Sequence, residues 1–265
     1  MDVYAQLSSQ SSLARAETAA CIALEYRNPP AECPRYLVSL REALREEYPP
    51  FATELYEEMY GQASASGQWL AMSFMTNAQR EGDKARRLWA LAARTSKNPA
   101  EQQLFKQHAC DESDHAIAYL KLLDLVFPGA VDAGFRSQLN ELGPGFSMDQ
   151  KLPEADDERQ PSLDEHIKLN LDELRKAIHH VLQQRALPLH CSAENLPAAT
   201  TTLNTLLSDE LKHIAYTAAI IEGDTSSVSA AELQTIFCRS FREFNRANSE
   251  EPIEYTYNQR FGNYP

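Results

Sequence analysis

The pentapeptide D-E-x-x-H occurs twice in this chain, from Asp111 to His115 and from Asp209 to His213, and it constrains the fold more than any other feature. An α-helix turns once in about 3.6 residues, so the glutamate and the histidine of each copy project from one helix face. A carboxylate and an imidazole placed in this way supply half of a two-metal site. Two copies, each following another helix that carries a carboxylate, predict a four-helix bundle around paired metal ions.

Each copy of D-E-x-x-H is preceded by a long amphipathic segment that bears a carboxylate. Within residues 68–97, apolar residues recur at steps of three and four, and Glu81 lies in the middle of that face. Before the second copy, Ser162 and Glu165 form an S-x-x-E capping box, which occupies Glu165 at the start of a helix. We therefore favour Glu173 over Glu165 as the metal-binding carboxylate of this helix, although Glu173 lies at the edge of the apolar stripe.

The predicted metal ligands are four carboxylates and two imidazoles: Glu81, Glu112, His115, Glu173, Glu210 and His213. Oxygen-rich ligands with two imidazoles suit iron(II) or manganese(II), whereas structural zinc favours thiolates or a closed tetrahedral set. Buried carboxylates need a cation beside them, because an unpaired buried charge is very costly. We expect two iron ions as the cofactor, with manganese as the alternative.

Other polar residues near the motifs are candidates for supporting roles. Asp111 and Asp209 each precede a ligand glutamate by one residue, about 100° around the helix. A metal-bound imidazole donates its other N–H to a carboxylate, so we expect Asp209 to orient His115 and Asp111 to orient His213. His108 lies one turn before the first glutamate, and the sequence leaves open whether it is an additional ligand or a hydrogen-bonding neighbour.

The remaining segments suggest accessory elements around the predicted bundle. Prolines break residues 1–60 into two or three short helices. The Gly-, Pro- and acid-rich stretch 143–161 is expected to link the two halves, either as a lid or as a plain connector. A second capping box, Ser229 to Glu232, opens a further helix, and the tail from Glu251 has no helical period.

The third long helix is expected to end at Pro188, which cannot continue the backbone hydrogen bonding. On that reading, His179 and His180 lie toward the end of the helix, where positive charge is favoured. We therefore expect these two histidines to form a surface cap and not to bind metal.

Composition excludes several classes of protein. The net charge of −13 argues against a nucleic-acid partner, which requires clustered Lys and Arg. Five scattered cysteines without C-x-x-C spacing are typical of reduced thiols in a cytoplasmic protein. The first residues lack a signal-peptide pattern, and no apolar run is long enough to cross a membrane, so we expect no membrane association.

The pattern resembles the ferritin-like diiron-carboxylate proteins. This superfamily includes ribonucleotide reductase small subunits, bacterial multicomponent monooxygenases, acyl desaturases, aldehyde-deformylating oxygenases and arylamine N-oxygenases. The resemblance covers residues 68–222 and rests on the six predicted ligands together with Asp111 and Asp209. Arylamine N-oxygenases usually carry a further histidine one turn before the second E-x-x-H. Leu206 occupies that place here, so the resemblance is to a stand-alone oxygenase of this general kind.

The resemblance implies a single all-α, ferritin-like domain over residues 1–265, with a four-helix bundle and three or four accessory helices. Residues 1–67 would be accessory, 68–222 the metal-binding core, and 223–265 a C-terminal helix and tail. It implies a non-heme diiron oxygenase that uses O2 to hydroxylate, N-oxygenate or oxidatively cleave a small organic substrate. An external electron donor would be required, because no flavin, nicotinamide or iron–sulfur motif is visible.

Two alternative functions would use the same ligands. One is a ferritin-like ferroxidase that oxidises and stores iron. The other is a manganese- or iron-containing radical-type subunit that needs a partner protein. The sequence is compatible with a homodimer, but it identifies neither the oligomeric state nor the substrate.

Overall fold

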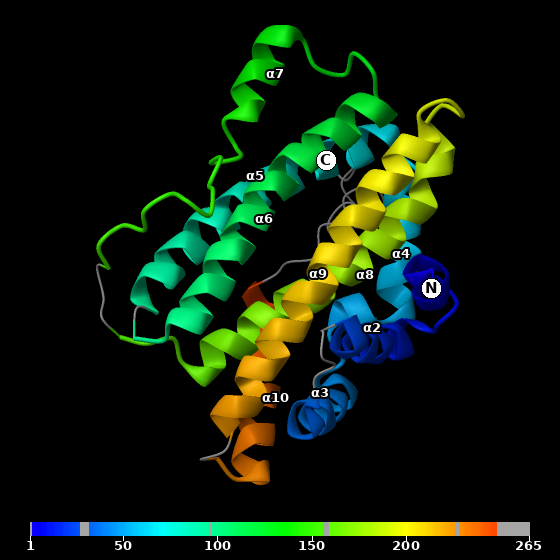
Figure 1. Ribbon diagram of the computed structural model, residues 1–265. Coiled ribbons are helices and arrows are strands. Elements are labelled where there is room, and N and C mark those ends of the chain that lie inside the picture. The colour runs from blue at the N-terminus through cyan, green and yellow to red at the C-terminus, as the bar shows by residue number, and fades with distance from the viewer. Residues whose placement is uncertain (1, 27–31, 96, 156–158, 226–227, 248–265) are drawn as a thin grey trace, which may run out of the picture. The chain divides into compact units, whose positions relative to one another are not determined.

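A computed structural model of the chain describes residues 2–26, 32–95, 97–155, 159–225 and 228–247. Within these residues all regular structure is helical, which confirms the all-α prediction (Figure 1). The tail from Glu251, which shows no helical period in the sequence, lies outside the described residues. The helices are α1 (Val3–Ser8), α2 (Ser12–Tyr26), α3 (Pro34–Glu47), the short 3-10 helix η1 (Pro50–Ala52), α4 (Glu54–Ser64), α5 (Gly67–Arg94), α6 (Pro99–Val126), α7 (Ala133–Asn140), α8 (Leu163–His190), α9 (Leu196–Asp224) and α10 (Ala230–Ala247).

The long helices begin where side chains satisfy their first backbone N–H groups. Asn98 accepts a hydrogen bond from the N–H of Glu101 and precedes Pro99, which needs no partner at the first position of α6. At the start of α8, the Ser162 N–H donates to Glu165 Oε2 at 2.9 Å and the Glu165 N–H donates to Ser162 Oγ at 3.3 Å. This reciprocal pair is the predicted capping box.

The prediction that Pro188 ends α8 is wrong, because the helix continues through it to His190. A proline removes one intrahelical hydrogen bond, but the next turn can still form. Here the N–H of Cys191 donates to the carbonyl of Leu187 at 2.8 Å. As a result, His179 and His180 lie well inside the helix, and a helix-end role does not apply to them.

The number of accessory helices also differs from the prediction. Besides α5, α6, α8 and α9, the described residues form six α-helices where the sequence predicts three or four. Two of the additional elements, α1 and α7, have only 6 and 8 residues. Segments this short do not show a helical hydrophobic period, so the sequence pattern does not predict them.

The helices form two compact units. The first unit comprises Met1–Ala65, Ser162–Ala186 and Leu207–Pro265, and the second comprises Ser66–Pro161 and Leu187–Leu206. Helices α8 and α9 therefore contribute residues to both units. The division into a bundle core at 68–222 and accessory ends remains a prediction.

In the second unit, α5 and α6 form an antiparallel hairpin joined by a short connection (Figure 1). Leu70, Phe74, Ala85 and Leu88 of α5 are buried along the predicted stripe. Glu81, in the middle of this stripe, is only 2% exposed. The apolar face of α5 therefore places one carboxylate in the interior of the hairpin.

In the first unit, an ion-pair cluster ties helices of the N-terminal region to α8. The guanidinium of Arg15, which is 2% exposed, donates to Glu57 Oε2 at 2.8 Å. Ser12 donates to the same oxygen, and Arg185 of α8 forms an ion pair with Glu57 Oε1. Residues far apart in the sequence thereby become neighbours within this unit.

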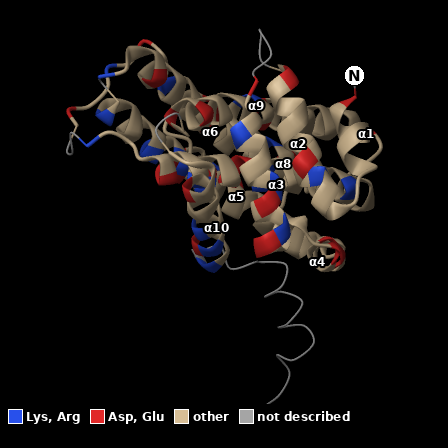
Figure 2. Ribbon diagram, turned by 90° about the horizontal axis from the view of Figure 1, so that it is seen from below, with Lys and Arg blue, Asp and Glu red and all other residues tan. Residues whose placement is uncertain are grey.

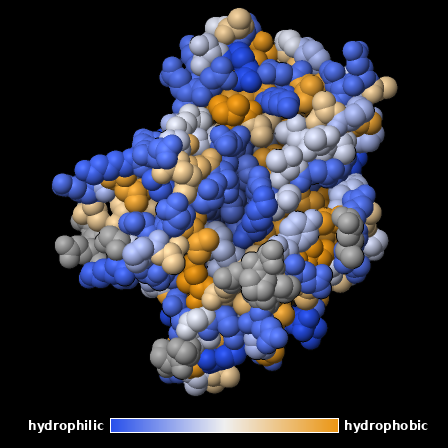
Figure 3. All heavy atoms as spheres, in the orientation of Figure 1, coloured by the Kyte–Doolittle hydropathy of each residue, from blue (hydrophilic) through white to orange (hydrophobic). Residues whose placement is uncertain are grey.

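The surface is predominantly hydrophilic. Lys and Arg are interspersed with Asp and Glu along the helices in Figure 2. On the face shown in Figure 3, hydrophobic residues form small patches between hydrophilic ones. Among the described residues, no helix has the length and apolar character needed to span a bilayer.

Candidate metal centre

The second unit brings together three of the six predicted ligands. Glu81 on α5 and Glu112 and His115 on α6 each offer a ligand atom, and these atoms lie within 4.8 Å of one another. The exposed fractions of the three residues are 2%, 0% and 3%, respectively. Nδ1 of His115 lies 3.5 Å from Oε2 of Glu112, so the i, i+3 pair of the first motif faces one point, as the helical spacing predicts.

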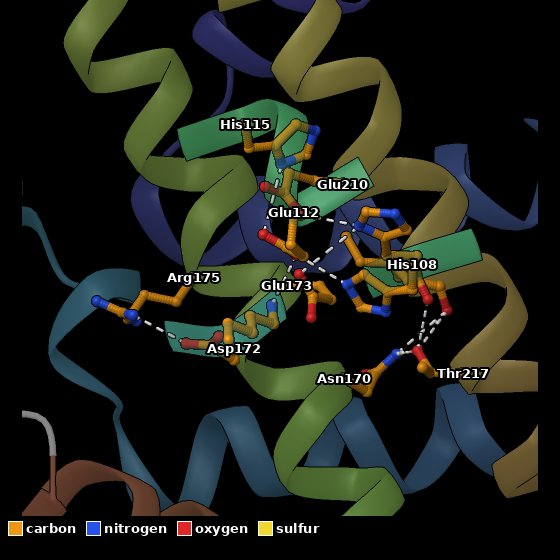
Figure 4. A network of polar contacts seen from close by, with 12 residues as sticks. His108, Glu112, His115, Asn170, Asp172, Glu173, Arg175, Glu210 and Thr217 are labelled. Carbon is orange, nitrogen blue, oxygen red and sulfur yellow. Dashed lines mark hydrogen bonds and ion pairs between the residues drawn. The ribbon is translucent and has the colours of Figure 1, made fainter. Parts of the chain in front are cut away.

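Two further buried groups contact the other carboxylate oxygen of Glu112. Nε2 of His108 lies 2.8 Å from Oε1, and Nζ of Lys84 lies 3.1 Å from the same atom (Figure 4). The contact of His108 fits either reading that the sequence left open. Lys84 was not predicted. Its position three residues after Glu81, on the same turn of α5, is the sequence signal that could have identified it.

The second-unit cluster contains two buried carboxylates, Glu81 and Glu112, and the ammonium of Lys84 lies 3.1 Å from Oε1 of Glu112. Burying an ion is costly unless an opposite charge lies close to it. A divalent cation at this point would supply the positive charge that the carboxylates require.

The first unit contains the other three predicted ligands. Glu173 lies on α8, and Glu210 and His213 lie on α9, with exposed fractions of 0%, 0% and 2%. Nδ1 of His213 lies 3.3 Å from Oε2 of Glu210 and 4.0 Å from Oε2 of Glu173. The second motif therefore repeats the geometry of the first, with an imidazole nitrogen beside the carboxylate three residues earlier.

The expectation that His180 belongs to a surface cap is wrong. This side chain is 1% exposed, and its Nε2 lies 3.3 Å from Oε1 of Glu210. Its neighbour His179 is directed elsewhere, with Nε2 2.6 Å from the hydroxyl of Tyr56. The reason is the length of α8, which continues to His190 and places both histidines in a packed stretch of the helix.

The two candidate glutamates of α8, Glu165 and Glu173, lie in different environments. Glu165 takes part in the capping box at the start of α8, whereas Glu173 is fully buried beside His213. Two turns of helix separate these positions, so the two carboxylates serve different environments. The capping role of Glu165 is present as predicted, and the assignment of Glu173 as a metal ligand stays a prediction.

The two aspartates have contacts on their own helices. Oδ1 of Asp111 accepts a hydrogen bond from Gln107 at 2.9 Å, and Oδ1 of Asp209 accepts one from Lys212 at 2.7 Å. Their expected contacts with the histidines of the opposite motif stay predictions.

A buried polar network links α3, α8 and α9 next to the first-unit ligands. Asn170, one turn before Glu173, accepts from the hydroxyl of Tyr36 at 2.8 Å and donates to Thr217 Oγ1 at 2.8 Å (Figure 4). The Thr217 hydroxyl donates in turn to the carbonyl of His213 at 2.7 Å. Burial raises the pKa of Tyr36 far above its usual value, so this hydroxyl keeps its proton. The network holds the backbone of α9 at His213, a predicted ligand.

The spacing between ligand atoms tests whether a metal ion fits these groups. Two ligand atoms, each about 2.1 Å from one ion and about 90–110° apart, lie about 3.0–3.4 Å from each other. The separation is 3.3 Å for His213 and Glu210, which is inside this range, and 3.5 Å for His115 and Glu112, which is 0.1 Å above it. Carboxylate oxygens and imidazole nitrogens are the donors that iron(II), manganese(II) and zinc(II) accept. The triad of Glu81, Glu112 and His115, whose ligand atoms lie within 4.8 Å of one another, therefore fits a divalent metal, and the Glu210–His213 pair has a similar separation.

Comparison with protein-family models, with curated proteins and with solved structures finds no match to this chain. The described residues therefore show an all-helical protein with buried clusters of glutamate and histidine that could hold a metal ion.

Proposed function

We propose that this protein is a non-heme diiron oxygenase of the ferritin-like kind. Glu81, Glu112 and His115 would bind one iron, and Glu173, Glu210 and His213 the other. The observation that carries the proposal is the duplicated geometry. In both D-E-x-x-H motifs, the glutamate is 0% exposed and one of its oxygens lies 3.3–3.5 Å from the imidazole three residues later. Surface acid–base pairs do not require such burial, whereas metal ligands in a helical interior do.

Paired iron ions, when bound, supply the electrons that reduce O2 and the Lewis acidity that stabilises its reduced forms. The side chains hold the ions and exclude water from them. Ala78 and Ala85, each 0% exposed, flank Glu81 on the buried face of α5, and Phe74 lies further along the same face. An apolar interior of this kind protects a reactive oxidant from water and strengthens each carboxylate–metal interaction.

The substrate would be a small organic molecule, and the reaction a hydroxylation, an N-oxygenation or an oxidative cleavage. The reducing equivalents would come from a separate donor, since no flavin, nicotinamide or iron–sulfur motif is present in the sequence. Manganese is the alternative metal, because carboxylate-rich sites also bind manganese(II).

The test is to load the metal-free protein with iron(II) without oxygen, measure the iron bound per chain, and then add O2. About two irons per chain and a transient visible absorption band are expected. The variants E112A and H213A should lose iron while circular dichroism shows intact helices. Binding of no metal by the wild-type protein would refute the proposal, and the growth of a large mineral core would favour iron storage.

A further inference from the structure

In the first unit, a buried tyrosine of α4 is hydrogen-bonded to a histidine of α8. The hydroxyl of Tyr56 lies 2.6 Å from Nε2 of His179. Tyr56 is 1% exposed, and Tyr60, one turn further along α4, is 3% exposed. The ring centroids of Tyr60 and His179 are 5.8 Å apart, so two phenol rings and one imidazole form a compact aromatic cluster. The proposed metal site uses none of these side chains.

The rings of Tyr56 and His179 lie side by side. Their planes are inclined by only 8°, and their centroids are 5.7 Å apart. The phenol oxygen and Nε2, one atom from each plane, are 2.6 Å apart, so the two planes are separated by no more than about that distance. Atoms of rings that stack face to face are about 3.5–4.0 Å apart. The hydrogen bond, and not ring stacking, is therefore the main contact of this pair.

The length of this hydrogen bond indicates that the phenol is the donor. A hydrogen bond from an N–H to an oxygen is about 2.7–3.2 Å long, whereas a hydroxyl donates to oxygen over about 2.5–3.0 Å. The separation of 2.6 Å between Tyr56 and His179 lies below the first range and inside the second. A phenol is also a weaker acid than an imidazolium ion, so a phenol at rest keeps its proton beside an imidazole.

A phenol that donates to a base loses an electron more easily than an isolated phenol. The loss of one electron makes the hydroxyl a strong acid, and a base at hydrogen-bond distance accepts the proton in the same step. The products would be a neutral tyrosyl radical at Tyr56 and an imidazolium ion at His179. One electron from a reductant, together with the proton returned by His179, restores the phenol.

The pair is connected to the proposed metal site through α8. His179 is followed by His180, whose Nε2 lies 3.3 Å from Oε1 of Glu210, a proposed ligand. One hydrogen bond, one peptide unit and one polar contact therefore join the phenol of Tyr56 to that carboxylate. All of these residues belong to the first unit. A short connection of this kind suits the transfer of single electrons between the phenol and a metal at Glu210.

We propose that Tyr56 is a redox-active tyrosine, which supplies one electron to the oxidised metal centre while His179 takes up its proton. The oxidant is the metal centre after its reaction with O2, so this role rests on the proposed function. When no organic substrate is bound, electron transfer from Tyr56 removes an oxidising equivalent that would otherwise attack the metal ligands. The external electron donor then reduces the tyrosyl radical, and His179 returns the proton.

The first experiment needs no metal. The full-length, metal-free protein is oxidised with photogenerated tris(bipyridine)ruthenium(III) and frozen, and its tyrosyl radicals are measured by electron paramagnetic resonance. The chain has 11 tyrosines, so oxidation without preference would assign one part in 11 of the signal to each. We expect Y56F to lose most of the signal. Y60F is the matched control, because Tyr60 packs on the same imidazole, and it should lose no more than its share.

The variant H179Q tests the role of the base separately from the number of tyrosines. Glutamine retains an oxygen that accepts a hydrogen bond from Tyr56, but it does not take up a proton. H179Q should therefore lose most of the signal although it keeps all 11 tyrosines. A wild-type signal in H179Q would show that His179 only packs against Tyr56, and a loss in Y56F no larger than in Y60F would show that Tyr56 is not preferred. Either result overturns the inference.

The second experiment identifies the oxidant. The same proteins are loaded with iron(II), exposed to O2 without an organic substrate and frozen at intervals, and the radical signal is compared per bound iron. Wild type and Y60F should form a tyrosyl radical that Y56F lacks. If the wild type binds iron and consumes O2 but forms no radical at Tyr56, the inference fails and the proposed function stands. If the wild type binds no iron, the proposed function fails and Tyr56 has no metal centre to reduce.

Discussion

The hydroxyl of Ser113, the residue that follows the proposed ligand Glu112, accepts a hydrogen bond from the backbone N–H of Gly145 at 2.8 Å. Gly145 has a φ of +66°, a conformation that favours glycine. The ring of Phe146 stacks on Trp89 of α5, with a centroid separation of 4.5 Å. The start of the 143–161 connection therefore contacts both α5 and α6, and one of these contacts is at the residue next to the proposed ligand Glu112.

Gly82, next to the proposed ligand Glu81, has no room for a side chain. A Cβ at this position would overlap the backbone carbonyl of Leu142, which cannot move without shifting the connection. We predict that G82A destabilises the protein by about 1–3 kcal/mol in urea unfolding, despite the better helix propensity of alanine. Gly61 in α4 is the control, because nothing lies within 4 Å of a Cβ there. G61A should be stabilising by about 0.5–1 kcal/mol, and equal effects of the two substitutions would contradict the packing argument.

Lys84 balances part of the buried negative charge when no metal is present. Its ammonium lies 3.1 Å from Oε1 of Glu112 and is 4% exposed. K84M should lower the stability of the metal-free protein by about 3–5 kcal/mol, since it leaves a buried carboxylate with less compensation. A bound metal replaces the missing charge, so the increase in melting temperature on adding iron(II) should be larger in K84M than in the wild type. An equal or smaller increase would argue against a metal beside Glu112.

The ligand assignment on α8 predicts opposite results for two glutamates on the same helix. E173A should lose metal, because this fully buried carboxylate lies beside His213. E165A should keep both metals and lose about 0.5–2 kcal/mol of stability, because it removes only the capping box. Metal analysis after gel filtration distinguishes the two. Retention of both ions by E173A, with loss in E165A, would reverse the assignment.

Asn170 holds α8 to α9 beside the first-unit ligands. Its amide donates to the carbonyl of Ile214 at 3.2 Å as well as to Thr217, and it accepts from Tyr36. N170L leaves these buried groups without their partner, so a loss of about 1–3 kcal/mol is expected. Metal affinity should fall as well, because the carbonyl of His213 is part of the same network. The double variant N170L/Y36F should recover part of the stability, and no recovery would indicate that Tyr36 does not depend on Asn170.

The cluster around Glu57 should make stability depend on acid pH. Burial raises the pKa of this carboxyl, but hydrogen bonds from Arg15, Ser12 and Arg185 outweigh that effect and lower it to about 2. A lowered pKa means that the stabilisation is complete above the ordinary carboxyl pKa, about 4.3, and is lost as the pH falls toward 2. E57Q should cost about 1–3 kcal/mol at neutral pH. The gap between wild type and variant should close between about pH 4.3 and 2, and a constant gap would refute the argument.

Local sequence was sufficient for those features that depend on a few neighbouring residues. The capping box of Ser162 and Glu165, the helical spacing of Glu112 and His115, and the burial of Glu81 on an apolar stripe follow from helix geometry and periodicity. Thr217 also follows a local rule, because its hydroxyl donates to the backbone carbonyl one turn earlier, as helical threonines often do.

Tertiary structure alone decided which polar residues at the edges of these helix faces became buried. His180 lies in no pattern that separates it from a surface residue. Arg15 is buried where its guanidinium pairs with Glu57 and donates to the backbone carbonyls of Leu7 and Gln10, contacts that the sequence of α2 does not predict. Side chains project from a helix in all directions around its axis. The sequence of one helix does not specify how many of these side chains the neighbouring helices cover. Burial at these positions depends on contacts between distant segments, which local periodicity does not record.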